Sequence, residues 1–318
     1  MIGFVVRRLL TLIPTWLGIS LFAFGLSTLS PGDPAELILG AELDRPPTPE
    51  QIAEFRERTG LDDPFVVQYV RFVTGAATGD LGKSFQSDEP VLGELVSRFP
   101  ATLEISVPAF VLALVLALLV GVISAIRRNS LADHLSRVAS LLGDSIPSFV
   151  LAYLLIIIFS VSLGVLPVAG RGGLDHLVLP VLTLALATTA TLMRLTRSSL
   201  LEVLGEDYVR TARAMGLPER AVIVRYALKN AMIAVVTVAG LLFAGFITGI
   251  VIVETVFAWP GVGRYVVEAI FDRDYAVIRG FVVFTGTVFV LINLVVDLLY
   301  LRLDPRVRLY GRGRSGGR

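Results

Sequence analysis

The chain has 318 residues, of which 54% are hydrophobic and 17% are charged, and its formal net charge is +1. Soluble globular chains carry roughly a quarter charged residues, so this composition indicates a membrane protein. The near-neutral balance argues against nucleic-acid binding, which needs a basic surface. The absence of cysteine excludes a disulfide framework, a thiol nucleophile and a zinc–thiolate site.

Six apolar segments are long enough to cross a membrane, since a spanning helix needs about 20 residues for a hydrocarbon core about 30 Å thick. The first follows Arg7-Arg8, and because its apolar run is too long for a signal peptide we expect an uncleaved anchor. The fifth contains Gly240, Gly245 and Gly249, which would allow close helix approach. The predicted spans are about 9–29, 104–126, 138–165, 177–194, 230–253 and 280–301.

The distribution of Lys and Arg predicts the orientation of these spans. Basic residues are concentrated before the first span and after the second, fourth and sixth spans. Because short cytoplasmic loops carry the excess of basic residues, we expect both termini on the cytoplasmic side.

The segment 30–103 between the first two spans is far longer than a connection needs. Thr48 to Gly60 is typical of a short helix, with a Thr-Pro start and a Gly stop, and Pro64 to Thr74 is a second candidate. We therefore predict a small ordered cap on the outer face. The alternative is a flexible acidic linker.

The charged segment Glu206–Ala231 separates two long apolar runs. We predict a helix over Glu206–Met215 with Val209, Ala212 and Met215 on one side. Gly216 would end it and Pro218 would begin a second helix towards Ala231. A membrane protein has no packing reason to keep such a segment in water, so the hypothesis is that a soluble partner binds it. The alternative is an amphipathic helix on anionic lipid, which its basic residues also favour. These are Arg210, Arg213, Arg220, Arg225 and Lys229.

The segment Glu254–Tyr275 mixes aromatic residues, Trp-Pro-Gly and charge between the last two predicted spans. It would be a partly re-entrant gate only if its backbone is buried in protein. The alternative is that Phe257, Trp259 and Tyr265 anchor the chain at the membrane interface. The gate candidates are Phe257, Trp259, Pro260 and Gly261.

No constellation of catalytic or metal-binding residues is found, so we expect neither an enzyme nor a cofactor or metal in this chain. Neither HExxH nor GxSxG occurs. Gly82-Lys83-Ser84 lacks the first glycine of a phosphate-binding loop, because position 77 is Ala77. We expect structural roles for Asp144, near a helix boundary, and for Asp297, near Arg302 and Arg306. Polarity alone suggests residues that line a pathway: Thr188, Thr189, Thr191, Gly245 and Thr248.

Several blocks occur in the order found in one transporter family. They are Arg7-Arg8, Pro31-Gly32-Asp33-Pro34, Gly79-Asp80-Leu81-Gly82, Ser145-Ile146-Pro147-Ser148-Phe149, Glu254-Thr255-Val256-Phe257-Ala258-Trp259-Pro260-Gly261 and Leu303-Asp304-Pro305-Arg306. With these blocks the chain resembles the permeases of binding-protein-dependent ABC importers, in particular the dipeptide/oligopeptide/nickel family. Within it the chain is similar to the B-type partner of a permease heterodimer.

The resemblance implies that the charged segment couples the permease to an ATPase. The family's loop is usually Glu-Ala-Ala-x3-Gly followed by Ile-x-Leu-Pro. Ala212, Gly216 and Leu228 match it, whereas Arg210, Thr211, Tyr226 and Lys229 depart from it. The implied coupling residues are Arg210, Thr211, Ala212, Gly216, Leu217, Pro218 and Leu228.

The resemblance also implies an all-α membrane protein with the type I ABC importer permease fold. Six transmembrane helices, with N-in/C-in topology, would carry an extracytoplasmic cap after the first helix. The expected domains are 1–29 with the first transmembrane helix, the cap 30–103, a five-helix core 104–301 and a cytoplasmic tail 302–318. The core includes the coupling loop 195–229 and the extracytoplasmic loop 254–279.

The implied function is one half of a pathway that imports short peptides by alternating access in the bacterial inner membrane. The implied partners are a second homologous permease, two ATP-binding subunits or one fused, and an extracytoplasmic substrate-binding protein. ATP and Mg would be bound by the ATPases. The cargo stays open among dipeptides, oligopeptides, glutathione, nickel chelates, haem and oligosaccharides. A stand-alone channel or secondary carrier is the alternative, and it predicts charged residues and broken helices at the bilayer midplane.

Overall fold

The computed structural model describes residues 2–29, 34–43 and 46–303. Helices account for most of these residues, and a single isolated bridge, between Lys83 and Pro90, is found among them. The chain divides into two compact units, which are described separately: unit 1 is Met1–Thr102 with Pro260–Val290, and unit 2 is Leu103–Trp259 with Leu291–Arg318.

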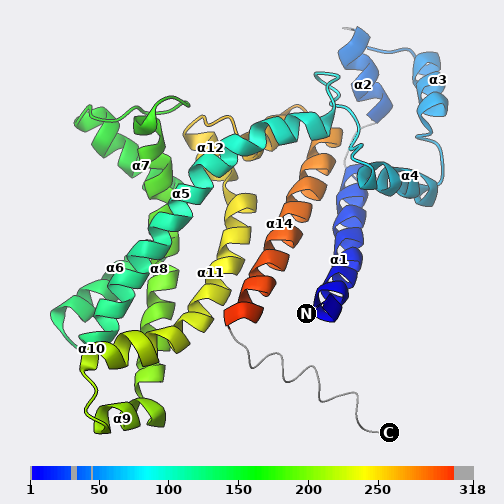
Figure 1. Ribbon diagram of the computed structural model, residues 1–318. Helices are drawn as coiled ribbons and strands as arrows, with labels where there is room; N and C mark the ends of the chain where they lie inside the picture. Colours follow the sequence, from blue (N-terminus) through cyan, green and yellow to red (C-terminus); the bar gives the residue numbers. More distant parts are fainter. Residues whose placement is uncertain (1, 30–33, 44–45, 304–318) are drawn as a thin grey trace, which may run out of the picture. The chain divides into compact units, whose positions relative to one another are not determined.

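Unit 1 consists of two stretches of the chain, Met1–Thr102 and Pro260–Val290, and its described residues are mostly helical (Figure 1). Its core contains the buried residues Leu81, Val91, Leu95, Val262 and Val277, against which aromatic side chains of several elements pack. The elements are α1 Ile2–Leu29, α2 Pro34–Leu43, α3 Pro49–Thr59, α4 Phe65–Ala77, the first part of α5 Val91–Ile126, α13 Val262–Phe271 and the first part of α14 Tyr275–Leu303.

The helices predicted for segment 30–103 are confirmed. α3 has a capping box, in which the backbone N–H of Gln51 donates to Thr48 Oγ1 (3.4 Å) and that of Thr48 donates to Gln51 Oε1 (2.9 Å). Gly60 then ends the helix in the left-handed region, at φ 69°. α4 ends at Ala77, beyond the predicted Thr74. α2 was not predicted, because its sequence read only as Pro-rich and acidic.

Unit 2 is arranged around α8, which packs against α6, α7, α9, α11 and α12. Small residues bring its helices close together: a Cβ atom at Gly121 would lie 2.8 Å from Thr196 Cβ, and one at Gly240 would lie 2.5 Å from Val296 Cγ1. The role expected for Gly240 is therefore confirmed. The further elements are α6 Leu131–Ser145, α7 Ser148–Leu155, the π-helix η1 Ile156–Ser162, α8 Leu174–Leu204, α9 Asp207–Ala214, α10 Glu219–Ala221, the π-helix η2 Val222–Leu228, α11 Lys229–Gly249 and α12 Val251–Val256.

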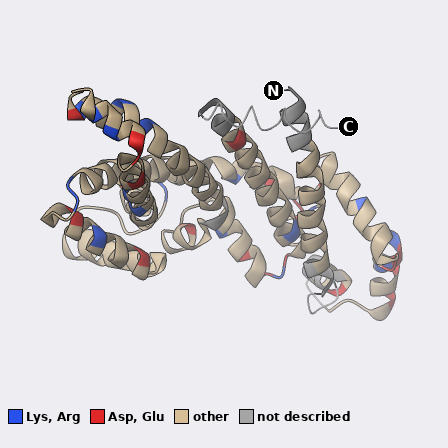
Figure 2. Cartoon of the chain, turned by 90° about the horizontal axis from the view of Figure 1, so that it is seen from below, with Lys and Arg blue, Asp and Glu red and all other residues tan. Residues whose placement is uncertain are grey.

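Four helices in the described chain are long and apolar enough to cross a membrane: Val91–Ile126, Leu174–Leu204, Glu219–Ile247 and Tyr275–Leu298. They contain most of the second, fourth, fifth and sixth predicted spans. In α1, the apolar stretch Leu10–Gly25 is shorter than these four. Charged side chains are sparse along the long helices (Figure 2).

The third predicted span, 138–165, is not one straight helix. α6 and the α7–η1 pair are bent by 104° at a short break. The residue before a proline is disfavoured in the helical region, and Ile146, before Pro147, is extended at φ −89° and ψ 116°. The predicted span 138–165 is therefore interrupted at Pro147, and the pair counts as a fifth span only if it is taken as one broken helix.

The close approach of α5 and α8 at Gly121 gives a testable prediction. Gly121→Ala places a methyl group against Thr196 and the backbone oxygen of Met193 (2.9 Å), so we expect a loss of about 1–3 kcal/mol in unfolding free energy. Gly18→Ala in α1 is the matched control, since nothing lies within 4 Å of that position. The control should be neutral or slightly stabilising. Thermal unfolding in detergent measures both, and equal melting temperatures would contradict the packing.

Candidate functional site

The charged segment Glu206–Ala231 follows the end of α8 and leads into α11. Glu206 is extended, α9 runs over Asp207–Ala214, and the chain then turns through Gly216 to Pro218. The predicted first helix is confirmed. The second does not end near Ala231, because α10, η2 and α11 continue one another as a single apolar helix over Glu219–Ile247. The turn therefore leads directly into a membrane-spanning helix.

One side of α9 is buried against the neighbouring helices. Val209, Ala212 and Val222 form a cluster against which Val203, Leu204 and Leu217 pack. The expected inward side is confirmed for Val209 and Ala212 but wrong for Met215, which is 67% exposed. Met215 caps the helix, with ψ near 0°, so it lies outside the regular repeat that brings residues 209 and 212 to one face.

Gly216 reverses the chain after α9. Its φ is +76°, in the left-handed region that favours glycine, and a Cβ atom there would meet nothing within 4 Å. The backbone N–H of Gly216 donates to the carbonyl of Arg213 (2.9 Å), and that of Leu217 donates to Ala212 (3.4 Å). Glycine is therefore required here by backbone conformation and not by lack of space.

A pair of oppositely charged side chains closes the turn. Arg213 donates from Nη2 to Glu219 Oε1 (2.8 Å) and from Nε to Glu219 Oε2 (3.1 Å). This bonding to the Glu219 carboxylate raises the pKa of Arg213. Both side chains are well exposed, so the pair contributes at most about 1 kcal/mol. Its fork geometry orients α9 relative to the start of α10 more than it stabilises the fold.

The residues implied for coupling divide into an exposed and a supporting set. Arg210, Thr211, Gly216 and Pro218 are exposed, whereas Ala212 is buried and Leu217 is half-buried. Leu228 is half-buried in η2, outside the α9 cluster. The exposed set can contact a partner, and Ala212 and Leu217 hold the helix that presents it.

An ion pair missed by the sequence analysis fixes the end of α8 that leads to α9. Arg197 donates from Nε to Asp133 Oδ1 (2.6 Å) and from Nη2 to Asp133 Oδ2 (2.9 Å). Ser124 Oγ donates to Oδ1 (2.6 Å) and the N–H of Asn129 to Oδ2 (2.9 Å), while Asp133 is fully buried. The pair joins α6 and the end of α5 to α8. An arginine inside an apolar helix, with Ser130 three residues before Asp133, was the signal available in the sequence.

A second pair lies along the same two helices. Asp144 pairs with Arg194, and Thr191 Oγ1 donates to Asp144 Oδ1 (3.4 Å). This contact agrees with the structural role expected for Asp144. For Asp297, the expected partners Arg302 and Arg306 have side chains outside the described part of the chain.

The predicted gate residues lie in an ordered segment. Phe257 and Trp259 are buried, and Ala258 between them has a φ of +50°. The N–H of Trp259 donates to Glu254 (2.8 Å), and Gly170 donates to the carbonyl of Phe257 (2.8 Å). The burial shows that these two rings pack inside the protein. Pro260 is half-buried and Gly261 precedes α13; the gate role stays a prediction.

The residues suggested for the pathway differ in their contacts and exposure. Thr189 Oγ1 donates to the carbonyl of Ala185 (2.7 Å), so it satisfies its own helix, and Thr188 is half-buried. Gly245 is exposed, with nothing within 4 Å of a Cβ position. The side chain of Thr248 lies outside what the structure describes. Their pathway role stays a prediction.

Among the described residues, no group of three His, Asp or Glu side chains could hold a metal ion. The exposed turn offers a surface that a partner could contact, and the Asp133–Arg197 pair lies beneath the surface.

Comparison with known proteins identifies two family models that together cover most of the chain. "Binding-protein-dependent transport system inner membrane component" matches residues 117–309, and the N-terminal model of the same transport system membrane components matches residues 1–106.

Curated relatives match nearly end to end. The Di/tripeptide transport system permease protein DppB of Pseudomonas aeruginosa is 42% identical, covering 97% of this chain and 99% of the relative. The Glutathione transport system permease protein GsiC of Salmonella paratyphi A is 44% identical with the same coverage. The Dipeptide transport system permease protein DppB of Escherichia coli K12 is 40% identical, again over 97% and 99%. A crystal structure of an amino acid ABC transporter with histidines aligns with a TM-score of 0.46 and 14% identity, over 69% of this chain and 94% of that one.

The ion pair between Asp133 and Arg197 gives a testable prediction. Asp133→Ala leaves the half-buried Arg197 guanidinium without its partner, so we expect a loss of at most about 3–5 kcal/mol in unfolding free energy. Asp207→Ala is the control, because Asp207 also pairs with an arginine, Arg210, but both side chains are exposed. It should cost less than about 1 kcal/mol. Thermal unfolding in detergent measures both variants. An equal fall in the two melting temperatures would contradict the larger contribution expected of the Asp133–Arg197 pair.

Proposed function

The chain belongs to the family of binding-protein-dependent transport system inner membrane components and is a permease subunit of an ABC importer; from this premise we propose that it imports short peptides. Relatives that match it over almost their whole length are named for di- and tripeptides, dipeptides and glutathione, which is itself a peptide. A short peptide is the cargo class that these names share.

The observation that carries the coupling proposal is the α9 turn. It presents Arg210, Thr211 and Pro218 to solvent on a helix whose other side is buried against α8 and η2. A partner ATPase that binds these exposed residues would move α9, which packs against α8 and η2. Gly216 sets the direction of the chain at the turn through its left-handed backbone.

Movement of α9 would be transmitted to the spanning helices through the elements that it packs against. The ion pair between Arg197 and Asp133 joins the adjoining part of α8 to α6, and η2 continues directly into α11. ATP-driven closure of the partners shifts the permease between inward-open and outward-open states only if their grip on α9 differs between the two states. ATP and Mg are bound by those partner subunits in this proposal.

The remaining architecture follows the family. α1 and the bent α6–α7–η1 pair complete six crossings with the four long helices, both termini lie in the cytoplasm, and segment 30–103 caps the outer face. The second half of the pathway comes from a homologous permease in the bacterial inner membrane. Two ATP-binding subunits, or one fused, and an extracytoplasmic binding protein complete the importer.

Co-purification tests the assignment directly. The full chain is isolated from native membranes in mild detergent and its partners are identified by mass spectrometry. We expect a second permease and ATPase subunits in fixed ratio, together with a peptide-binding protein. Isolation of the chain alone or only with itself would favour a stand-alone channel or carrier.

Substitution of Gly216 tests the role of the turn. Gly216→Val forces a β-branched residue into the left-handed region, at a cost of about 1–2 kcal/mol, and we expect peptide uptake to fall at least about tenfold at normal membrane levels. Gly164→Val is the matched control, because Gly164 also has a positive φ (64°) and open space around it but lies at the end of η1. Uptake of a labelled dipeptide measures both. Equal uptake by the two variants would contradict a coupling role for the turn.

A further inference from the structure

Unit 1 contains an arginine, Arg279, that pairs with no carboxylate of the residues described there. Arg279, near the start of α14, stacks on Phe72 (4.6 Å from the guanidinium carbon to the ring centre) and on Phe24 (5.6 Å). Its Nε atom is buried and has no hydrogen-bond acceptor among the residues that the structure describes. A desolvated guanidinium with unused donors is costly unless a ligand supplies the acceptor.

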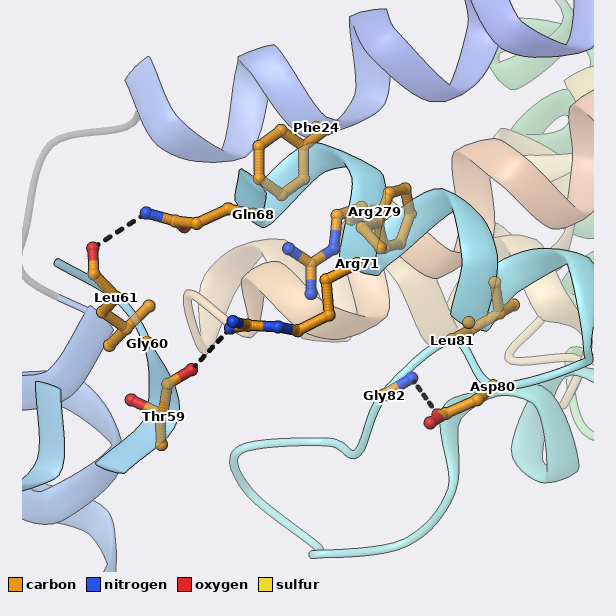
Figure 3. Close-up of a pocket in the computed structure, with 12 residues that line it drawn as sticks. Phe24, Thr59, Gly60, Leu61, Gln68, Arg71, Asp80, Leu81, Gly82 and Arg279 are labelled. Atoms are coloured by element: carbon orange, nitrogen blue, oxygen red, sulfur yellow. Dashed lines mark hydrogen bonds between the residues drawn. The ribbon is translucent and has the colours of Figure 1, made fainter. Parts of the chain in front are cut away.

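A pocket opens beside this side chain. Its volume is about 240 Å³, and Figure 3 shows Arg71 and Arg279 lying side by side within it. A second cavity of about 600 Å³ shares Arg279, Phe24, Gln68 and Gly82 with the first. Gly82 lies beside the pocket, where a Cβ atom would be 4.0 Å from Arg279 Nη2, and its φ of +85° is in the left-handed region that favours glycine. We call these joined cavities the Arg279 pocket.

The other cations that line the Arg279 pocket have carboxylate partners. Arg71 donates to Asp63 (2.6 Å), Lys83 pairs with Asp88 (3.1 Å) and Arg56 pairs with Asp62 (3.6 Å). Asp80 accepts a hydrogen bond from the backbone N–H of Gly82 (2.9 Å) and forms no ion pair with Arg279. Among the described basic residues that line the pocket, Arg279 therefore has no carboxylate partner, and the pocket favours an anion.

The position of the pocket indicates where that anion comes from. Phe24 lies at the end of the apolar stretch Leu10–Gly25 of α1, and Arg279 lies at the beginning of the apolar helix Tyr275–Leu298. In the six-span arrangement proposed above, both residues lie where the helices meet the polar layer of a membrane. Phospholipid phosphates occupy that layer, and basic side chains there attract anionic headgroups.

α4 adds an apolar surface beside the pocket. It crosses the end of α1 that is farther from the N-terminus (Figure 1), where Tyr69 donates a hydrogen bond to the carbonyl of Leu17 (3.0 Å). Gln68 and Arg71 line the pocket, whereas Val66 and Val70, on another side of the helix, are 67% and 53% exposed. A short helix with an exposed apolar side and a polar side, here Gln68 and Arg71, can lie in the membrane interface.

We propose that the Arg279 pocket binds the phosphate of an anionic membrane phospholipid, whose acyl chains lie along the exposed valines of α4. The planar fork of Arg279 donates to the phosphate oxygens while its faces stay stacked on Phe24 and Phe72. The bound lipid joins α1, α4 and α14 at one height of the membrane. This site is distinct from the proposed coupling surface and does not depend on which cargo the importer carries.

Native mass spectrometry of the delipidated full-length chain tests the proposal. Phosphatidylglycerol is titrated against the wild type, Arg279→Gln and Arg58→Gln. We expect one lipid to bind the wild type, with an affinity that falls at least about tenfold in Arg279→Gln, corresponding to about 1.4 kcal/mol. Arg58→Gln is the matched control, since Arg58 also stacks on a ring, that of Phe55, but is absent from the lining of the pocket. It should bind lipid like the wild type.

Three competitors distinguish the sources of the anion. Diacylglycerol lacks the phosphate, inorganic phosphate lacks the acyl chains, and a dipeptide offers only a carboxylate; none should displace the lipid. Displacement by inorganic phosphate or by the dipeptide, or equal lipid binding by Arg279→Gln, would overturn the proposal. If Arg279→Gln does not fold, Arg279→Lys and Val70→Asn take its place, and both must weaken lipid binding while the melting temperature without lipid is unchanged.

Discussion

The bidentate ion pair between Arg197 and Asp133 is the interaction on which the part of unit 2 that leads into α9 depends. Asp133 has no exposed surface, and it accepts from a guanidinium, a hydroxyl and a backbone N–H at once. A buried charge pair is tolerated only when such additional bonds satisfy it. Because its partners come from α5, α6 and α8, the pair fixes three elements directly beside the turn that leads to α9. A soft support there would absorb any motion that a partner imposes on the turn.

The turn itself shows why the family's loop pattern is kept at some positions and lost at others. Ala212 is buried against Val209 and Val222, where a larger side chain would not fit the cluster, and Gly216 has a left-handed backbone. These two positions match the pattern. Arg210 and Thr211 depart from it, and both are exposed. Packing constrains Ala212 and backbone conformation constrains Gly216, whereas neither constraint applies to the exposed Arg210 and Thr211.

Arginines pair with carboxylates in both units, and in unit 1 these pairs include Arg71 with Asp63 and Arg56 with Asp62. In unit 2, Arg197, Arg194 and Arg213 are each matched by a carboxylate of the same unit, and they hold helices in place. In unit 1, Arg279 is stacked on two rings without such a match. An arginine that is paired with a carboxylate helps to hold helices together, whereas an arginine without such a partner can bind an anion from outside the chain. The proposed lipid would supply the missing acceptor and, with it, an anchor for the helices around α4.

The sequence by itself determined the class of protein, four of the long apolar helices, the capped α3, the Gly216 turn and the family. Each of these depends on local physics: hydrophobic length, a Thr48 cap, or a backbone that only glycine adopts readily. Tertiary structure alone decided which charges meet. Asp133 and Arg197 are 64 residues apart in the chain, and Phe24 and Arg279 are farther still. The break before Pro147 and the position of Met215 at a helix cap are local effects, whereas the 104° angle of the bend could be read only from the tertiary structure.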